Sequence, residues 1–194
     1  MIIENKIYTG KIPEITSPLG FQYLWAENGI YIHAKNDFFE AIKQCCSTSE
    51  GPGQKLEEKL FCKSRVSLGI FEWICREFEA SRDKEKMIMI TYDTETKEFN
   101  TYVPEQSASA VSVEYTVPEL KEGEIVILEC HSHPNMNAFF SEADDKDNQG
   151  FKVYGVFAVN SGKVDDFMLR LGVYGRFFEI GFHDIFEEFF NDKA

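Results

Sequence analysis

The chain has 194 residues and a formal net charge of −13, and 43% of its residues are hydrophobic. This length suits one domain with a small appendage, and the apolar content is enough for a packed core, which excludes a disordered chain. The acidic balance without a Lys/Arg cluster excludes nucleic acid as the main partner, and no apolar run approaches the roughly 20 residues that span a membrane.

The first 60 residues are expected to form a small α+β unit. Residues 21–34, FQYLWAENGIYIHA, predict a hairpin because two β-rich runs flank an Asn-Gly turn. Residues 36–46, NDFFEAIKQCC, predict a short helix with Asn36 or Asp37 as its N-cap.

A loop rich in Ser, Gly and Pro follows at residues 47–55 and marks a possible boundary. We therefore expect residues 1–60 as a small N-terminal unit and residues 61–194 as the main domain. His33, in the hairpin, is interpreted as a surface strand residue that takes no part in a site.

The main domain begins with a predicted helix over residues 65–80, where Leu68, Phe71, Cys75 and Phe78 form one apolar stripe. The remaining expected elements are strands at residues 86–93, 98–105, 111–117, 124–133, 151–159, 166–174 and 176–180, with helices at 140–149 and 183–190. This order indicates an α+β (mixed α/β) fold in which helices pack on a sheet.

The five cysteines include no Cys-x-x-Cys pair, which is typical of reduced thiols in the cytosol. Cys130 precedes His131 on a strand, so its side chain is expected to point to the opposite face and into the core. The N-terminal stretch MIIENKIYTG has no signal-peptide pattern, and we therefore expect a cytoplasmic protein.

A candidate metal site lies in ECHSHPNMNAFFSEADDKD, residues 129–147. His131 and His133 are two apart on a strand and so point to the same face, where two imidazoles can bind one ion. Asp144 completes a set of three ligands, which catalytic zinc uses while a fourth position stays open for water. Ser141 shares a helical face with Asp144 and can donate a hydrogen bond to a developing oxyanion.

A structural reading of the same residues also stands. Ser141 and Asp144 fit a Ser-x-x-Asp capping box at a helix N-terminus, where acidic residues are common. Asp145 and Asp147 are candidates for a second ion or for the repulsion of acidic ligands, but a solvated helix face is the preferred interpretation. His183 is expected near a helix start and outside the site.

The pattern His131-x-His133, seven residues from Pro134 to Phe140, then Ser141-x-x-Asp144 resembles the JAMM motif of the JAB/MPN metallopeptidases. The resemblance implies a curved mixed β-sheet flanked by helices, as in the cytidine deaminases. It also implies one Zn²⁺ held by His131, His133 and Asp144, with Ser141 assisting the tetrahedral intermediate. Typical members hydrolyse the isopeptide or peptide bond that follows the C-terminal Gly of ubiquitin or a ubiquitin-like protein.

The family also uses a glutamate upstream of the motif, after the first helix and at the start of the next strand. Glu85 occupies that place here and is the expected general base. Three rivals are weaker on position: Glu79 in the last helical turn, Glu105 in a turn, and Glu129 below His131 on its strand.

A narrower resemblance links the chain to protein A of the PRTRC cassette. This bacterial gene set includes a ParB-related protein, a ThiF-like activating enzyme and a small ubiquitin-like protein. Phe139, Phe140, Ser141 and the acidic residues Asp144, Asp145 and Asp147 carry most of the likeness. Pro134 departs from the glycine expected in that subgroup and is the usual residue in deubiquitinase members, so the chain also resembles the JAB deubiquitinase-like proteins of bacterial ubiquitin-like operons. The implied partners are a ubiquitin-like protein or its conjugates and a ThiF-like activating enzyme.

The leading hypothesis is therefore a zinc-dependent isopeptidase or peptidase that matures a ubiquitin-like protein or removes it from targets, by zinc-activated water. Two alternatives remain open. One is a non-catalytic MPN-type scaffold in a bacterial ubiquitin-like cassette. The other is a zinc hydrolase that acts on a small molecule or a sulfur-carrier adduct.

Overall fold

The computed structural model describes residues 3–81 and 83–188, and the chain divides into two compact units. Unit 1 is Met1–Ser64 and unit 2 is Arg65–Ala194. The division falls just after the position 60/61 expected from the sequence. The Ser/Gly/Pro-rich loop lies inside unit 1, where the Gly51 N–H donates to the Glu27 carbonyl at 2.9 Å.

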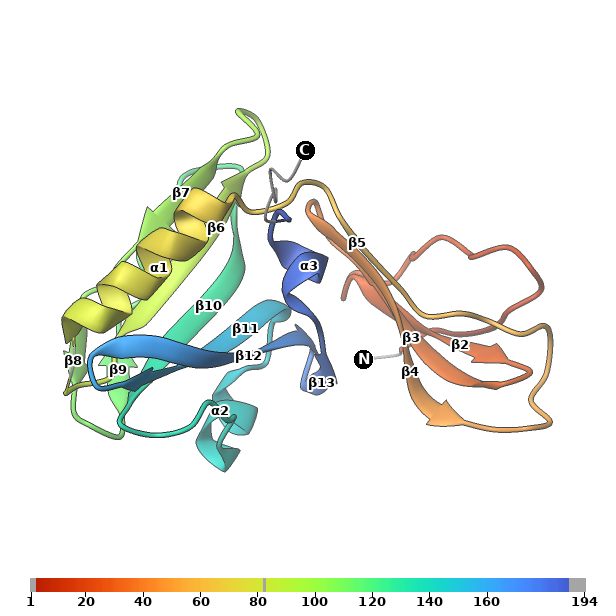
Figure 1. The fold of residues 1–194 in the computed structure, drawn as a ribbon. Helices are drawn as coiled ribbons and strands as arrows, with labels where there is room; N and C mark the ends of the chain where they lie inside the picture. Colours follow the sequence, from red (N-terminus) through yellow and green to blue (C-terminus); the bar gives the residue numbers. More distant parts are fainter. Residues whose placement is uncertain (1–2, 82, 189–194) are drawn as a thin grey trace, which may run out of the picture. The chain divides into compact units, whose positions relative to one another are not determined.

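Unit 1 is one five-stranded sheet with the strand order β1-β2-β3-β4-β5, drawn in red to orange in Figure 1. Its strands are β1 (Asn5–Ile7), β2 (Phe21–Ala26), β3 (Gly29–Lys35), β4 (Phe39–Ser47) and β5 (Lys59–Cys62). β1 pairs parallel to β2 and every other pair is antiparallel. The predicted hairpin over residues 21–34 is confirmed as β2 and β3.

The helix predicted over residues 36–46 is wrong, because Phe39–Ser47 forms strand β4 between β3 and β5. The Asn36 side chain does accept backbone N–H bonds, from Phe38 at 2.9 Å and Phe39 at 2.6 Å. It stabilises a turn that leads into a strand, and pairing on both sides overrides the local helix preference. Unit 1 as described is therefore all β.

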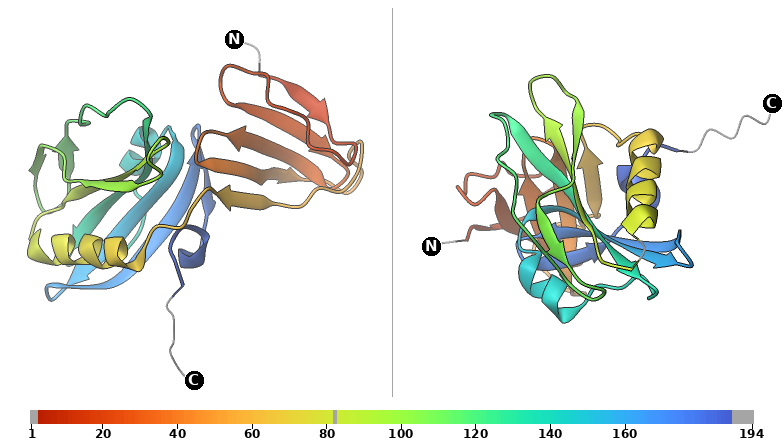
Figure 2. Two further views of the ribbon diagram at one scale, coloured as in Figure 1. Left: turned by 90° about the horizontal axis from the view of Figure 1, so that it is seen from above. Right: turned by 90° about the vertical axis from the view of Figure 1, so that its left-hand side faces the viewer.

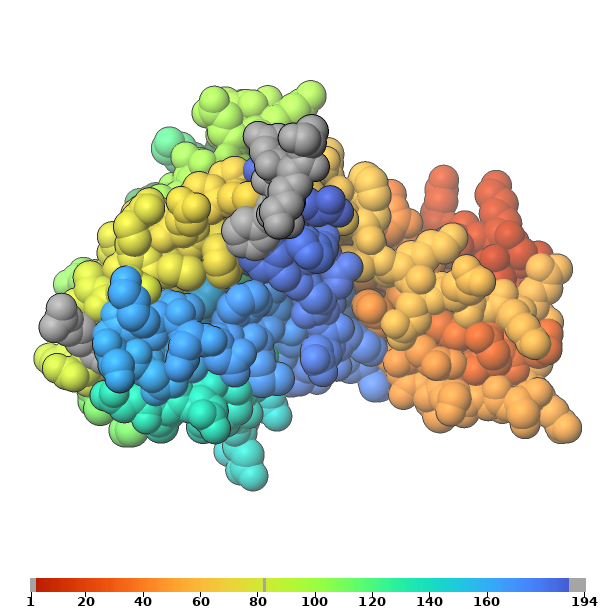
Figure 3. All heavy atoms as spheres, viewed as in Figure 1, coloured from red at the N-terminus to blue at the C-terminus, as the bar shows by residue number. Residues whose placement is uncertain are grey.

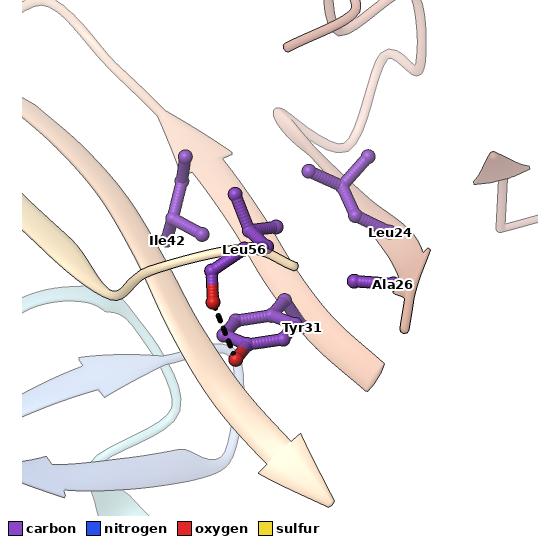
Figure 4. Close-up of a cluster of buried hydrophobic side chains, with 5 residues drawn as sticks. All are labelled: Leu24, Ala26, Tyr31, Ile42 and Leu56. Carbon is purple, nitrogen blue, oxygen red and sulfur yellow. Dashed lines mark hydrogen bonds between the residues drawn. The ribbon is translucent and has the colours of Figure 1, made fainter. Parts of the chain in front are cut away.

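One hydrophobic core cluster of unit 1 lies on one face of this sheet. Figure 4 shows the cluster, with Leu24, Ala26, Tyr31 and Ile42 from the strands and Leu56 from the loop after β4. The buried Tyr31 hydroxyl donates to the Leu56 carbonyl at 2.8 Å, so the loop is fixed to the sheet by a polar contact as well as by apolar packing.

Unit 2 contains a six-stranded mixed sheet with the order β13-β12-β11-β10-β6-β7. Its strands are β6 (Met87–Asp93), β7 (Phe99–Tyr102), β10 (Glu124–Pro134), β11 (Phe151–Asn160), β12 (Lys163–Val173) and β13 (Arg176–Glu179), and a separate hairpin is formed by β8 (Gln106–Ala108) and β9 (Val113–Tyr115). Only the central pair β10–β11 is parallel. The strands predicted for the main domain are confirmed, and the α+β fold with them.

Helix α1 (Leu68–Ser81) packs along β11 and β12, as the helix period predicted, and Figure 3 shows it beside β12 on one face. Phe71 and Phe78 from its apolar stripe meet Phe157 of β11, with ring centroids 6.0 and 5.2 Å apart. Phe78 and Phe157 are fully buried, and burial of a Phe side chain contributes roughly 1.5–3 kcal/mol. This aromatic layer fixes the helix on the sheet.

Two shorter helices complete unit 2. Helix α2 (Glu142–Asp147) lies on the opposite face of the sheet from α1, as Figures 1 and 2 show. Helix α3 (Phe182–Ile185) lies where a terminal helix was predicted, and the part of that prediction from residue 189 onward lies outside the described residues. Within the described part of the chain, no helix has the length and apolar character needed to cross a membrane.

Candidate metal centre

Two histidines lie at the carboxyl end of β10, the strand that joins the two halves of the unit 2 sheet. His131 pairs with Val156 of β11 and Met87 of β6, and His133 pairs with Ala158 of β11. Both residues are buried, with 8% of the surface of His131 and 4% of that of His133 exposed. Strand alternation places both imidazoles on one face, as predicted, and their Nε2 atoms lie 3.1 Å apart.

The surroundings of the two imidazoles suit metal binding. Nδ1 of His133 lies 3.1 Å from the Asn137 carbonyl, which can only accept, so Nδ1 donates in this contact while Nε2 faces His131. Burial, the largest effect, holds the pKa of His131 well below its ordinary value of 6.5. Neutral imidazole is the form that coordinates a metal.

The loop between β10 and α2 covers the second histidine. The Phe139 ring meets the His133 imidazole edge to face, with centroids 4.8 Å apart. Asn135 begins the loop with a positive φ of 56°, and its N–H donates to the Val159 carbonyl at 2.9 Å. The chain thereby reverses direction and brings the start of α2 back over the strand ends.

Helix α2 begins with the capping box predicted from the sequence. Ser141 is the N-cap, and its hydroxyl accepts the Asp144 N–H at 3.2 Å and donates to Asp144 Oδ2 at 2.7 Å. The other carboxylate oxygen, Oδ1 of Asp144, lies 3.5 Å from Nε2 of His131. Capping therefore holds the carboxylate beside the imidazole, and the structural and the metal-binding readings use the same geometry.

Glu85 lies beside the histidines because two backbone contacts fix the segment before β6. Lys86 and Ser132 bind each other twice, through Ser132 N–H to Lys86 O and Lys86 N–H to Ser132 Oγ, both at 3.0 Å. The Glu85 N–H donates to the Ser109 carbonyl at 2.8 Å. Its carboxylate is 7% exposed and lies 4.0 Å from Nε2 of His133.

The Glu85 carboxyl differs electrostatically from an exposed glutamate. Burial, and next the negative charge of Asp144, raise the pKa of Glu85 from 4.5 to about 7. Both protonation states are therefore populated near neutral pH, which suits a group that accepts and returns a proton.

The three rival glutamates do not reach the histidines. Glu79 pairs with Lys163 at 2.8 Å, and Glu129 pairs with Lys152 at 2.5 Å. Glu105 is exposed and precedes β8. Glu85 is thus the glutamate, of these four, that the fold brings to the candidate centre.

These side chains line one pocket of about 400 Å³. Its polar wall includes Glu85, both histidines, Ser141 and Asp144, and its apolar wall is formed mainly by Val111, Val113, Met136 and Phe139. A cavity of about 490 Å³ in unit 1 is larger, but His33 is the single imidazole among its described lining residues, whose other polar members are Glu14, Ser17, Lys35 and Glu40. The smaller pocket is therefore the candidate site.

Two of the three donor–donor distances in this set are close to those of a zinc site. Zinc bonds of about 2.0–2.1 Å in a tetrahedron place neighbouring donors roughly 3.3 Å apart. The 3.1 Å between the two Nε2 atoms and the 3.5 Å from His131 Nε2 to Asp144 Oδ1 are close to that value. As the side chains stand, the described residues include no formed group of three metal-binding His, Cys, Asp or Glu, and hydrogen bonds occupy these donors instead.

Several residues outside the motif have roles that differ from their sequence interpretation. His33 is buried, not on the surface, between Gln22 and Glu40. Asp145 is not simply solvated, because Oδ1 accepts from Arg170 at 2.5 Å. Cys130 is fully buried, as predicted.

Arg170 itself was missed by the sequence reasoning. It lies in β12 between Leu169 and Leu171 and is only 7% exposed. A single arginine within the apolar stretch 167–173 at the end of β12 was the available signal, since a charged residue is rarely buried without a partner.

Comparison with known proteins places these observations in a family. A family model described as prokaryotic homologs of the JAB domain matches residues 71–170, slightly more than half of the chain, and this range contains all five candidate residues. A search of curated proteins gave no match. The JAB family includes hydrolases. The chain therefore belongs to the prokaryotic homologs of the JAB domain, within the bacterial JAB/MPN proteins.

Proposed function

We propose that the protein is a zinc-dependent peptidase or isopeptidase that cleaves after the C-terminus of a ubiquitin-like protein. The observation that carries the proposal is the meeting of His131, His133, Asp144, Glu85 and Ser141 in one pocket, from three separate segments of the chain. Membership of the JAB family supports the hydrolase class.

His131, His133 and Asp144 would hold one Zn²⁺. Two neutral imidazoles and one carboxylate form a donor set typical of catalytic zinc, and the Nδ1–H of His133 bound to a backbone carbonyl is the usual support for a ligand histidine. Zinc, when bound, acidifies water and so supplies a nucleophile near neutral pH.

Glu85 would accept a proton from the attacking water and return it to the leaving amine. Its burial beside the histidines and its pKa of about 7 suit both directions of transfer. A glutamine at this position keeps the shape of the side chain but cannot carry the proton.

Ser141 would stabilise the oxyanion that develops on the substrate carbonyl. Its hydroxyl proton now goes to Asp144 Oδ2, so this role requires the hydroxyl to turn towards the substrate. Opposite it, Val111, Met136 and Phe139 form an apolar wall that suits a peptide chain.

The proposed substrates are a ubiquitin-like protein or its conjugates in the bacterial cytoplasm, and the proposed partner is a ThiF-like activating enzyme from the same cassette. The absence of a Cys-x-x-Cys pair in the sequence is consistent with that compartment. A non-catalytic MPN-type scaffold is the second candidate, favoured by the bonds that already hold the Asp144 carboxylate to Ser141.

The test is cleavage of a fusion between a ubiquitin-like protein and a reporter, with zinc-loaded protein. Wild type should cleave after the C-terminus of the ubiquitin-like part, and Glu85→Gln should lose at least about 100-fold of the rate, within the range for general acid–base catalysis, while it keeps its zinc. Full activity in Glu85→Gln removes Glu85 from the mechanism. Zinc bound by a wild type that cleaves no fusion favours the scaffold.

A further inference from the structure

Helix α2 carries Ser141 at its N-cap and Asp144 in its first turn, yet it has little support of its own. It is six residues long, and none of them is buried. A short isolated helix is unstable in water, because the entropy lost in ordering its first turn exceeds the free energy gained from so few hydrogen bonds. A contact from outside the helix must therefore hold it in place.

Arg170 of β12 makes that contact. Its Nη1 donates to Oδ1 of Asp145 at 2.5 Å, and Asp145 is the residue after Asp144. Its guanidinium also lies over the ring of Phe140, 3.8 Å from the centroid, and Phe140 is the residue before Ser141. The two residues that flank the pair Ser141 and Asp144 are thus both bound by one side chain.

A third contact fixes Arg170 from its other side. The Phe177 ring of β13 lies 3.7 Å from the guanidinium, so the cation is placed between two aromatic faces. The guanidinium carbon is held, while Nε and Nη2 are buried without a hydrogen-bond partner among the described residues. Burial of a cation with unused donors costs stability, and such a cost is typical of a residue kept for a role other than stability.

We propose that Arg170 is a positioning residue for the metal centre. By stacking on Phe140 and pairing with Asp145, it fixes the first turn of α2 and so sets the Asp144 carboxylate against His131. Planarity matters here, because a guanidinium stacks on two rings while a lysine ammonium provides a point charge. The inference rests on the proposed function insofar as Asp144 is a zinc ligand.

The experiment compares three variants with wild type in the full chain. Arg170→Lys keeps the charge without the stacking plane, and Asp145→Asn removes only the ion pair. Glu142→Gln is the matched control, since it removes the same charge from an exposed residue in the same helical turn. Arg170→Met is not used, because it would remove the stacking plane and the ion pair with Asp145 at the same time.

Two readouts separate positioning from general stability. Hydrogen exchange of the amides of residues 142–147 is measured in metal-free protein, together with the amides of β10 and β11. Zinc affinity is measured by competition with a chelator. We expect Arg170→Lys and Asp145→Asn to accelerate exchange in α2 alone and to weaken zinc binding roughly tenfold or more, as loss of outer-shell support does, with Glu142→Gln unchanged in both.

Unchanged exchange in α2 for both variants overturns the inference, as does faster exchange with unchanged zinc affinity. Equal acceleration in α2, β10 and β11 also overturns it, because the role is then general stability. If wild type binds no zinc, the proposed function fails separately, and the exchange of α2 alone decides whether Arg170 holds the helix.

Discussion

Glu85 and His133 lie with Oε1 and Nε2 4.0 Å apart, although one precedes β6 and the other ends β10. The contact depends on the paired hydrogen bonds between Lys86 and Ser132, which join the start of one strand to the end of the other. A carboxyl group buried at this junction, near the Asp144 charge, has its pKa raised to about 7. This relationship makes the pH response of the centre testable before any substrate is known.

Glu85→Gln should stabilise the metal-free protein by an amount that grows as the pH rises from 4.5 to above 7. A carboxyl whose pKa is higher in the folded state stabilises the fold fully below its unfolded value of 4.5, and this contribution is lost as the pH rises through about 7. The variant should therefore exceed wild type by less than about 1 kcal/mol at pH 5 and by on the order of 1–3 kcal/mol at pH 8. Denaturant unfolding of chelator-treated protein at both pH values measures the difference.

Glu105→Gln is a suitable control, because this glutamate is exposed and far from a buried partner. It should show no difference from wild type at either pH. A stability difference for Glu85→Gln that is equal at pH 5 and pH 8 would contradict the raised pKa.

Ser141→Ala should loosen α2 without affecting the sheet. The hydroxyl accepts the Asp144 N–H and donates to its carboxylate, and loss of a serine N-cap costs about 1 kcal/mol. Amides of residues 142–147 should then exchange about fivefold faster, with those of β10 unchanged. Ser141→Thr keeps both hydrogen bonds and should restore slow exchange; equal exchange in the Ala variant and wild type would mean that the cap is not needed.

Asp144→Asn should remove the thermal stabilisation that zinc confers. The amide is a poor ligand beside the two histidines, so zinc affinity should fall at least about 100-fold, and the gain in melting temperature on zinc addition should vanish. Glu142→Gln removes a charge from the same helical turn and should keep the gain. Retention of zinc stabilisation in Asp144→Asn would exclude this residue as a ligand.

His33 gives unit 1 an acid sensitivity of its own. Burial lowers its pKa below 6.5, so stability is present above pH 6.5 and is lost as the pH falls towards the folded-state value. Trp25 lies in β2, and Trp73→Phe leaves its fluorescence as a reporter of unit 1. In that background the unfolding midpoint should fall between pH 7 and pH 5, and His33→Gln should flatten the fall; a fall that persists in His33→Gln would assign it to another group.

The elements of the site could be predicted from the sequence where the local pattern of apolar and capping residues matches the structure that forms. The apolar period of residues 65–80 gave α1, the apolar run 124–133 gave β10, and Ser141 with Asp144 gave the start of α2. Glu85 was found through the resemblance and its position, and the structure places its carboxylate beside His133.

Other features depend on partners distant in the sequence and were not predictable from local patterns. Phe39–Ser47 has a sequence that permits a helix, but pairing with β3 and β5 makes it a strand. The burial of His33 depends on Gln22 and Glu40 across the sheet, and the role of Arg170 depends on Phe140, Asp145 and Phe177 from two other segments.

Zinc titration of chelator-treated wild type, beside the double variant His131→Ala, His133→Ala, tests the central claim most directly. The account predicts about one zinc bound per wild-type chain, with a rise in melting temperature, and neither effect in the double variant. A folded wild type that binds no zinc, or binds it equally without the two histidines, would contradict the proposed metal centre.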